Sequence, residues 1–258
     1  MIGTNAFNLT GRLALVTGSS QGIGFALAKG LADAGARIVL NGRRQDALTD
    51  AAARIGAAAH APGDGLGLFD VTDPEAVEAG VARIEHEAGP IEILVNNAGI
   101  QRRQPLEEFP VETWREVMRT NLDSVFFVGQ AVAKRMILRG HGKIINIASL
   151  QSEAARPTIA PYTASKGAVK MLTKGMCADW ARHGLQINAI GPGYFETELN
   201  RKLRDDPEFH AWLCKRTPAG RWGKVEELCG TAVFLASSAS DFVNGQVIYV
   251  DGGVLSVL

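Results

Sequence analysis

The chain has 258 residues, with 27 basic and 27 acidic side chains, and so carries no formal net charge at pH 7. Hydrophobic residues make up 46% of it and charged residues 21%, which excludes a largely disordered chain. A nucleic-acid partner would need a basic excess, so we expect none. No apolar run reaches the roughly 18 residues that a membrane-spanning helix needs, so we expect no membrane partner.

Cysteine and histidine usage gives no sign of a metal site. The three cysteines have no C-x-x-C spacing and the five histidines have no metal-binding spacing, so we expect neither a disulfide framework nor a metal. The first residues lack the basic flank and apolar core of a signal peptide. With reduced thiols, this predicts a cytoplasmic location.

Short runs rich in Val, Ile and Leu alternate with longer segments of helical periodicity along the whole chain. Such runs are typical of strands covered on both faces of a parallel sheet. The predicted strands are 13–17, 37–41, 67–71, 91–98, 143–149, 185–190 and 246–253, and the predicted helices are 22–34, 46–55, 74–87, 111–138, 158–182 and 225–237. The alternation predicts a single α/β domain over residues 1–258. It is a Rossmann-type, doubly wound parallel sheet of about seven strands with helices on both faces.

The longest irregular segment, residues 191–223, directly follows a predicted strand. Ligands of open α/β sheets bind beyond the carboxyl ends of the strands. We therefore interpret this segment as a substrate loop or lid, with its own helix near 207–215. A plain surface insertion is the alternative.

The first predicted strand leads into TGSSQGIG, residues 17–24, and then into a helix. Gly18 permits the tight turn, Gly22 lets the backbone approach a pyrophosphate, and Gly24 lets helix and strand pack closely. A strand before and a helix after are the context of a dinucleotide-binding turn, in which helix N–H groups hold the anion. A glycine-rich turn without a ligand is the alternative.

The glycine spacing resembles the TGxxxGIG turn of the short-chain dehydrogenase/reductase family, and further motifs of that family follow in order. They are Asp70, NNAG at 96–99, Asn121, Ser149, Tyr162-x-x-x-Lys166 and Pro192-Gly193. The resemblance covers nearly the whole chain. It implies an oxidoreductase that transfers a hydride between a nicotinamide cofactor and an alcohol or ketone.

The resemblance assigns the catalytic roles to Asn121, Ser149, Tyr162 and Lys166. Tyr162 and Lys166 are four residues apart and so share a helix face, where the ammonium favours the phenolate of a group whose pKa is otherwise near 10. Tyr162 is the expected general acid and base, and Lys166 also contacts the nicotinamide ribose. Ser149 donates to the substrate oxygen, and Asn121 holds a water in a proton relay. The Tyr–Lys pair alone would fit an amphipathic surface helix better, but four matching positions favour catalysis.

By the same resemblance, several segments hold the cofactor. Asp70 meets the adenine, although a turn or capping role fits it nearly as well, and residues 192–197 grip the carboxamide. The expected cofactor-binding residues are Gly18, Ser20, Gln21, Gly22, Ile23, Gly24, Arg43, Arg44, Asp70, Val71, Asn97, Ala98, Gly99, Tyr162, Lys166, Pro192, Gly193, Phe195 and Thr197.

The end of the second predicted strand favours NADP over NAD. NAD enzymes hold the ribose 2′-hydroxyl with an acidic residue about 20 residues beyond the glycines, whereas this chain reads Asn41-Gly42-Arg43-Arg44. Guanidinium groups pair bidentately with phosphate. We therefore predict NADP, with Arg43 as the main contact and Arg44 assisting. Two solvated arginines at a helix start are the alternative.

Segments such as NNAGIQRR at 96–103 and GPGYFETE at 191–198 resemble the gluconate 5-dehydrogenases within this family. This implies a sugar-acid substrate, whose carboxylate needs a cation and whose hydroxyls need polar partners. The candidate substrate residues are Arg102, Arg103, Ser149, Gln151, Glu153 and Tyr162, with Arg103 as the clamp and Gln151 and Glu153 contacting hydroxyls. Surface ion pairs are the alternative for the two arginines.

Other functions remain open at this stage. They are a 3-oxoacyl-carrier-protein reductase, another polyol or keto-sugar reductase, and a non-catalytic dinucleotide-binding scaffold. The predicted helices 111–138 and 158–182 carry apolar residues on more than one side, which is typical of buried helices. The family uses these helices as a subunit interface, so the resemblance implies a homotetramer.

Overall fold

The computed structural model describes residues 4–59 and 67–257. Six strands form one parallel sheet in the order β2-β1-β3-β4-β5-β6. Their bounds are β1 Leu13–Val16, β2 Arg37–Leu40, β3 Ile91–Asn96, β4 Gly142–Ile147, β5 Leu185–Pro192 and β6 Val247–Val250. The predicted α/β fold is confirmed. The strand order reverses at β1, which is where open α/β sheets bind ligands.

The predicted count of about seven strands is wrong by one. Residues 67–71 make only a single bridge to the sheet, between Gly42 and Leu68. This segment is held beside the end of β2 by the side chain of Asn41, whose Nδ2 donates to the carbonyl oxygens of Gly67 at 2.9 Å and Phe69 at 3.1 Å. The N–H of Gly42 donates to the same Gly67 carbonyl at 3.3 Å.

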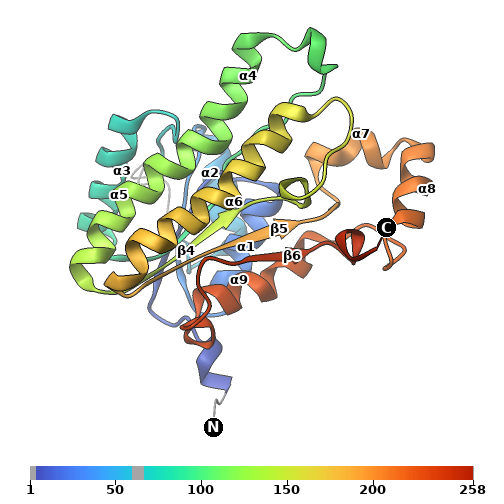
Figure 1. Ribbon diagram of the computed structural model, residues 1–258. Helices are drawn as coiled ribbons and strands as arrows, with labels where there is room; N and C mark the ends of the chain where they lie inside the picture. The colour runs from blue at the N-terminus through green and yellow to red at the C-terminus, as the bar shows by residue number, and fades with distance from the viewer. Residues whose placement is uncertain (1–3, 60–66, 258) are drawn as a thin grey trace.

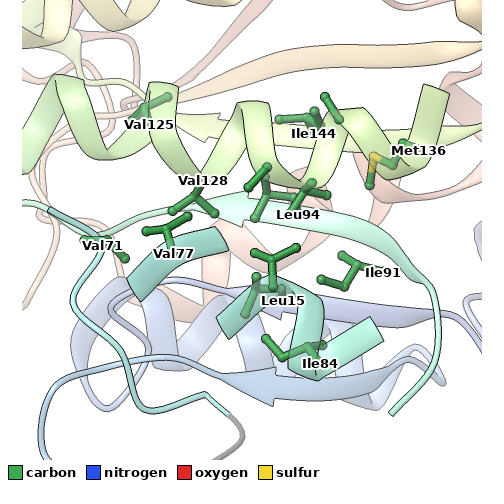
Figure 2. Close-up of a cluster of buried hydrophobic side chains, with 14 of the residues drawn as sticks. Leu15, Val71, Val77, Ile84, Ile91, Leu94, Val125, Val128, Met136 and Ile144 are labelled. Carbon is green, nitrogen blue, oxygen red and sulfur yellow. The ribbon is translucent and has the colours of Figure 1, made fainter. Parts of the chain in front are cut away.

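Helices cover both faces of the sheet (Figure 1). On one face lie α1 Gly22–Asp33, α2 Gln45–Ile55 and α9 Cys229–Ala236, and on the other lie α3 Pro74–Glu87, α5 Ser124–Arg139 and α6 Ala160–Trp180. A hydrophobic core lies between the sheet and the helices on each face. Figure 2 shows the core under α3, α5 and α6. There, Val77 and Ile84 of α3 and Val128 of α5 pack with Leu15 and Leu94 of the sheet. This core fixes α5 and α6 against the strands whose ends form the site.

The predicted helix 111–138 is interrupted. It consists of α4 Val111–Met118, a π-helical turn Arg119–Asp123, and α5. The turn brings the fully buried Asn121 against the backbone of Ile100: Oδ1 accepts from its N–H at 2.7 Å and Nδ2 donates to its carbonyl at 2.9 Å. Single π-helical turns inside helices are frequent at functional sites.

The segment after β5 carries two further helices, α7 Arg201–Arg204 and α8 Pro207–Arg216, and α8 is the helix predicted near 207–215. Asp206 begins α8 by accepting hydrogen bonds from the N–H groups of Glu208 and Phe209. Arg216 donates to the carbonyl of Val257 at 2.9 Å. In Figure 1, α8 accordingly lies beside the C-terminus, at one end of the molecule.

Candidate active site

A cleft of about 90 Å³ lies at the carboxyl ends of β4 and β5. Its walls combine residues predicted for catalysis, for the cofactor and for the loop after β5. The lining residues are Ile23, Gln101, Ile147, Ala148, Ser149, Leu150, Gln151, Arg156, Ile159, Tyr162, Pro192, Gly193, Tyr194, Phe195, Thr197 and Asn200. The cleft thus brings together parts of three predicted motifs: Ile23 of the glycine turn, the pair Ser149 and Tyr162, and Pro192-Gly193.

The glycine turn fits tightly against the segment that follows β3. Gly18 has φ +59°, and a Cβ there would lie 2.9 Å from Cα of Ala98. A Cβ at Gly24 would lie 2.4 Å from Nδ2 of Asn97, which donates to the carbonyls of Thr17 and Gly18 at 2.9 and 3.0 Å. By contrast, no atom lies within 4 Å of a Cβ built on Gly22, at the start of α1. The turn therefore presents open backbone at a helix N-terminus, as a pyrophosphate requires.

Ser149 and Tyr162 face each other across the cleft. Ser149 follows β4 directly, and its Oγ accepts from the N–H of Gln151 at 3.1 Å. Tyr162 lies in the first turn of α6 and is hydrogen-bonded to Ser149. Both hydroxyls are thus placed to contact one substrate oxygen.

Lys166 lies one turn after Tyr162 and is buried. Its Nζ is 5.7 Å from the centre of the Tyr162 ring and donates to the carbonyl of Ile147 at 2.6 Å. Burial lowers the pKa of Lys166 to about 8. Burial also raises the pKa of Tyr162, against the opposing hydrogen bond from Ser149. The predicted lowering of the tyrosine pKa is therefore absent here, because desolvation dominates and the lysine is directed to a backbone carbonyl.

Asn121 joins two parts of the site. Besides holding Ile100, its Nδ2 donates to Oγ of Ser165 on α6 at 3.1 Å. All three hydrogen bonds that the Asn121 side chain makes within the described ranges are therefore to Ile100 and Ser165. The role of Asn121 in holding a relay water stays a prediction.

Arg43 and Arg44 are exposed after β2, as NADP binding requires. Arg43 lies 3.8 Å from the carboxylate of Asp70, whose other oxygen accepts from the N–H and the hydroxyl of Thr72, both at 2.9 Å. Burial tends to raise the pKa of Asp70, but the Thr72 bonds and the charge of Arg43 outweigh it and lower that pKa. Asp70 thus has the turn role that was the alternative, and an adenine contact remains a prediction.

The remaining cofactor candidates fall in two groups. Ile23, Pro192, Gly193, Phe195 and Thr197 line the cleft. Oγ1 of Thr197 is buried and has no hydrogen-bond partner within the described part of the chain. Ser20 and Gln21 precede α1, Val71 follows Asp70, and Ala98 and Gly99 follow β3.

The substrate candidates divide between the cleft and the surface. Gln151 lines the cleft and its Oε1 is buried, with no partner among residues 4–59 and 67–257. Arg102 instead pairs with Glu116, Nη2 to Oε1 at 2.6 Å, and is exposed. Glu153 pairs with Lys170 and accepts from the hydroxyl of Tyr249 at 2.7 Å. Neither Arg102 nor Glu153 lines the cleft.

Arg156 lines the cleft although the sequence analysis did not select it. It hydrogen-bonds to Tyr194, which is also hydrogen-bonded to Gln151 and feels the charge of Arg103. The one available signal was a lone arginine in the loop between Ser149 and Tyr162. Arg103 lies near this group but outside the lining of the cleft.

No group of three or more His, Cys, Asp or Glu side chains in residues 4–59 and 67–257 is arranged to hold a metal ion, and His60 falls outside these ranges. No helix within them is long and apolar enough to cross a bilayer.

Comparison with known proteins identifies the family. The family model described as enoyl-(acyl carrier protein) reductase matches residues 18–255. Gluconate 5-dehydrogenase of Gluconobacter oxydans (strain 621H) is 63% identical over 248 residues, 96% of each chain. The 5-keto-D-gluconate 5-reductase of Escherichia coli (strain K12) is 53% identical over 252 residues, 96% of this chain and 97% of that one.

A solved structure agrees closely in fold. The crystal structure of a gluconate 5-dehydrogenase from Burkholderia cenocepacia J2315, in complex with NADP and tartrate, is 61% identical, with a TM-score of 0.94 over 98% of this chain and 99% of that one. Together with the glycine turn and the Ser149–Tyr162–Lys166 arrangement, these matches show that the chain belongs to the short-chain dehydrogenase/reductase family of NAD(P)-dependent alcohol dehydrogenases and ketone reductases.

Proposed function

We propose that this protein interconverts D-gluconate and 5-keto-D-gluconate, with NADP as the cofactor and Tyr162 as the acid and base. The observation that carries the proposal is the cleft, where Ser149 and Tyr162 lie beside the polar side chains of Gln151 and Arg156. The names of two relatives that match over 96% of this chain support the same substrate pair.

In the oxidation, Ser149 and Tyr162 hold the C5 hydroxyl of gluconate between them. The phenolate of Tyr162 takes the hydroxyl proton as the C5–H bond breaks, and the hydroxyl of Ser149 donates to the carbonyl oxygen that forms. When bound beside the cleft, the nicotinamide of NADP would supply the hydride acceptor for the oxidation, and that of NADPH the hydride donor for the reduction. Lys166, with its lowered pKa, is placed to pass a proton onward from the tyrosine.

The site fits NADP in two respects. The backbone around Gly22 is open at the start of α1, where helix N–H groups attract a pyrophosphate. Arg43 and Arg44 are exposed at the end of β2, where a 2′-phosphate would be neutralised. The Burkholderia relative, which is named as a complex with NADP, supports this choice.

A 3-oxoacyl-carrier-protein reductase is the second candidate, because the matching family model is described as an enoyl-(acyl carrier protein) reductase, whose substrates are carried by the same kind of protein. A thioester has no carboxylate for Arg156, however, and few groups for Gln151. The polar cleft therefore favours the sugar acid.

We also propose that the protein acts as a homotetramer assembled through α5 and α6. Phe126 on α5 and Met171 on α6 are large apolar side chains that are 43% and 60% exposed in the single chain. A second subunit packed on these helices would cover them. The cytoplasmic location stays a prediction.

The proposal is tested by nicotinamide absorbance with D-gluconate, 5-keto-D-gluconate and an acetoacetyl thioester, each with NADP(H) and NAD(H). We expect turnover of the first two and a preference for NADP(H). Turnover of the thioester alone would select the second candidate, and no turnover of any of them would favour a non-catalytic scaffold.

A further inference from the structure

Two arginines lie near enough for their charges to interact: Arg156, which lines the cleft, and Arg103, which is exposed. The charge of Arg156 lowers the pKa of Arg103, an effect that adds to the larger effect of burial. Within residues 4–59 and 67–257, neither arginine has an Asp or Glu oxygen within the 4.0 Å of an ion pair. Arg102 next to them has such a partner in Glu116.

The guanidinium of Arg156 is held in place by aromatic residues of the segment after β5. Its Cζ lies 5.6 Å from the centre of the Phe209 ring of α8. Phe209 in turn packs 5.7 Å from the ring of Tyr194, to which Arg156 is hydrogen-bonded. The arginine is therefore oriented before any ligand arrives, which reduces the entropy lost on binding.

One hydrogen-bond donor of Arg156 is not used by the described part of the chain. Its Nε is buried and has no hydrogen-bond partner among the described residues. Arginine stays charged in proteins, and buried charges are normally paired. An anion placed between Arg156 and Arg103 would supply the missing partner, and a carboxylate matches the planar fork of a guanidinium.

We propose that Arg156, with Arg103 beside it, binds the carboxylate of the substrate and so selects sugar acids over neutral polyols and ketoses. The identity of the substrate rests on the proposed function, but the carboxylate site itself does not. Gln151, whose Oε1 faces no partner, lies next to this site and would contact a hydroxyl of the same molecule.

The test compares Arg156→Gln and Arg156→Lys with the parent enzyme, using two substrates. L-sorbose carries a hydroxymethyl group where 5-keto-D-gluconate carries its carboxylate. We expect Arg156→Gln to lower kcat/KM for 5-keto-D-gluconate by about 10²-fold or more, chiefly through KM, because a desolvated charge contact is lost. The loss with L-sorbose should be much smaller, so the ratio of the two kcat/KM values should fall by about tenfold or more, and Arg156→Lys should fall between, since it keeps the charge but not the fork.

Arg54→Gln is the matched control. Arg54 also stacks on a phenylalanine, with Cζ 3.9 Å from the centre of the Phe25 ring, but it lies on α2 away from the cleft. It should leave both substrates unaffected.

Tartrate binding to the NADP-bound protein, measured by calorimetry, tests the carboxylate site without turnover. We expect the parent to bind tartrate and Arg156→Gln to weaken binding by a similar factor. Equal affinity in the two, or no binding by the parent, would overturn the proposal, as would equal losses with both substrates. A parent that binds tartrate through Arg156 but ignores 5-keto-D-gluconate would refute only the proposed function.

Discussion

Tyr162 is subject to two opposing effects within the cleft. Burial raises the pKa of its phenol, while the hydrogen bond from Ser149 acts in the other direction. In the reduction that we propose, a raised pKa would keep the proton on Tyr162 until it is transferred to the substrate oxygen. In the oxidation, the same residue must first lose its proton, so gluconate oxidation should speed up as the pH rises above neutrality.

Replacing Tyr162 by Phe removes the transferred proton and little else. We expect Tyr162→Phe to lower kcat by about 10²–10⁴-fold, the usual contribution of one positioned acid or base, with cofactor affinity retained. Steady-state NADPH oxidation gives the rate, and a fluorescence titration with NADPH gives the affinity. A variant with near-parent kcat would remove Tyr162 from the mechanism.

Lys166 links catalysis to stability through its buried charge. The pKa of Lys166 is about 8 in the folded protein, whereas the ordinary value of 10.5 applies in the unfolded chain. Between these values the unfolded chain binds more protons than the folded one, so this residue makes the free energy of unfolding rise with pH. Below pH 8 both states are protonated, and the burial cost of about 3 kcal/mol is fully present.

Lys166→Met should therefore be more stable than the parent at pH 7, and this advantage should shrink between about pH 8 and 10.5. Urea unfolding of both proteins at pH 7 and pH 10 measures it. A stability difference that is the same at both pH values would show that Lys166 carries no such penalty.

We propose that the turn from β2 into α2 selects NADP over NAD. Arg43 has a side chain that is 75% exposed and only a 3.8 Å contact with Asp70, so its charge remains available to a 2′-phosphate. Arg43→Ala should raise KM for NADPH about tenfold or more, the value of a charge-assisted hydrogen bond, while KM for NADH changes little. Unchanged values for both cofactors would reassign the phosphate contact.

The sequence predicted those elements whose signal is local. The glycine turn and α8 follow from neighbouring residues: Gly18 must take positive φ, and Asp206 caps the helix that Pro207 starts. The same holds for Tyr162 and Lys166, whose spacing on one helix puts the Lys166 Nζ 5.7 Å from the centre of the ring of Tyr162, which lines the cleft.

The features that the sequence analysis missed depend on distant contacts. The π-helical turn accompanies a contact of Asn121 with the backbone of Ile100, far from it in the sequence, while the helical pattern of 111–138 runs on without a break. Residues 67–71 make a single bridge to the sheet and are held by the side chain of Asn41, 26 and 28 residues before its two partners. Arg156 looks like any loop arginine until α8 brings Phe209 against it.

The outer surfaces of α5 and α6 bear on the assembly of the protein. Met171→Glu would place a charge in the proposed subunit interface, so we expect sedimentation velocity to show a tetramer for the parent and smaller species for this variant. Thr49→Glu, on α2 across the sheet, is the control and should remain tetrameric. A parent that sediments as a monomer, or a Met171→Glu tetramer as stable as the parent, would contradict an interface on these helices.

The most direct test of the proposed reaction is the position of the transferred hydrogen. The enzyme is given 5-keto-D-gluconate and NADPH deuterated at C4 of the nicotinamide, on each face in turn, and the product is examined by NMR. We predict that one of the two cofactors delivers deuterium to C5 and that the product is D-gluconate. Product without deuterium from either cofactor, deuterium at another carbon, or the C5 epimer L-idonate would contradict the proposed activity.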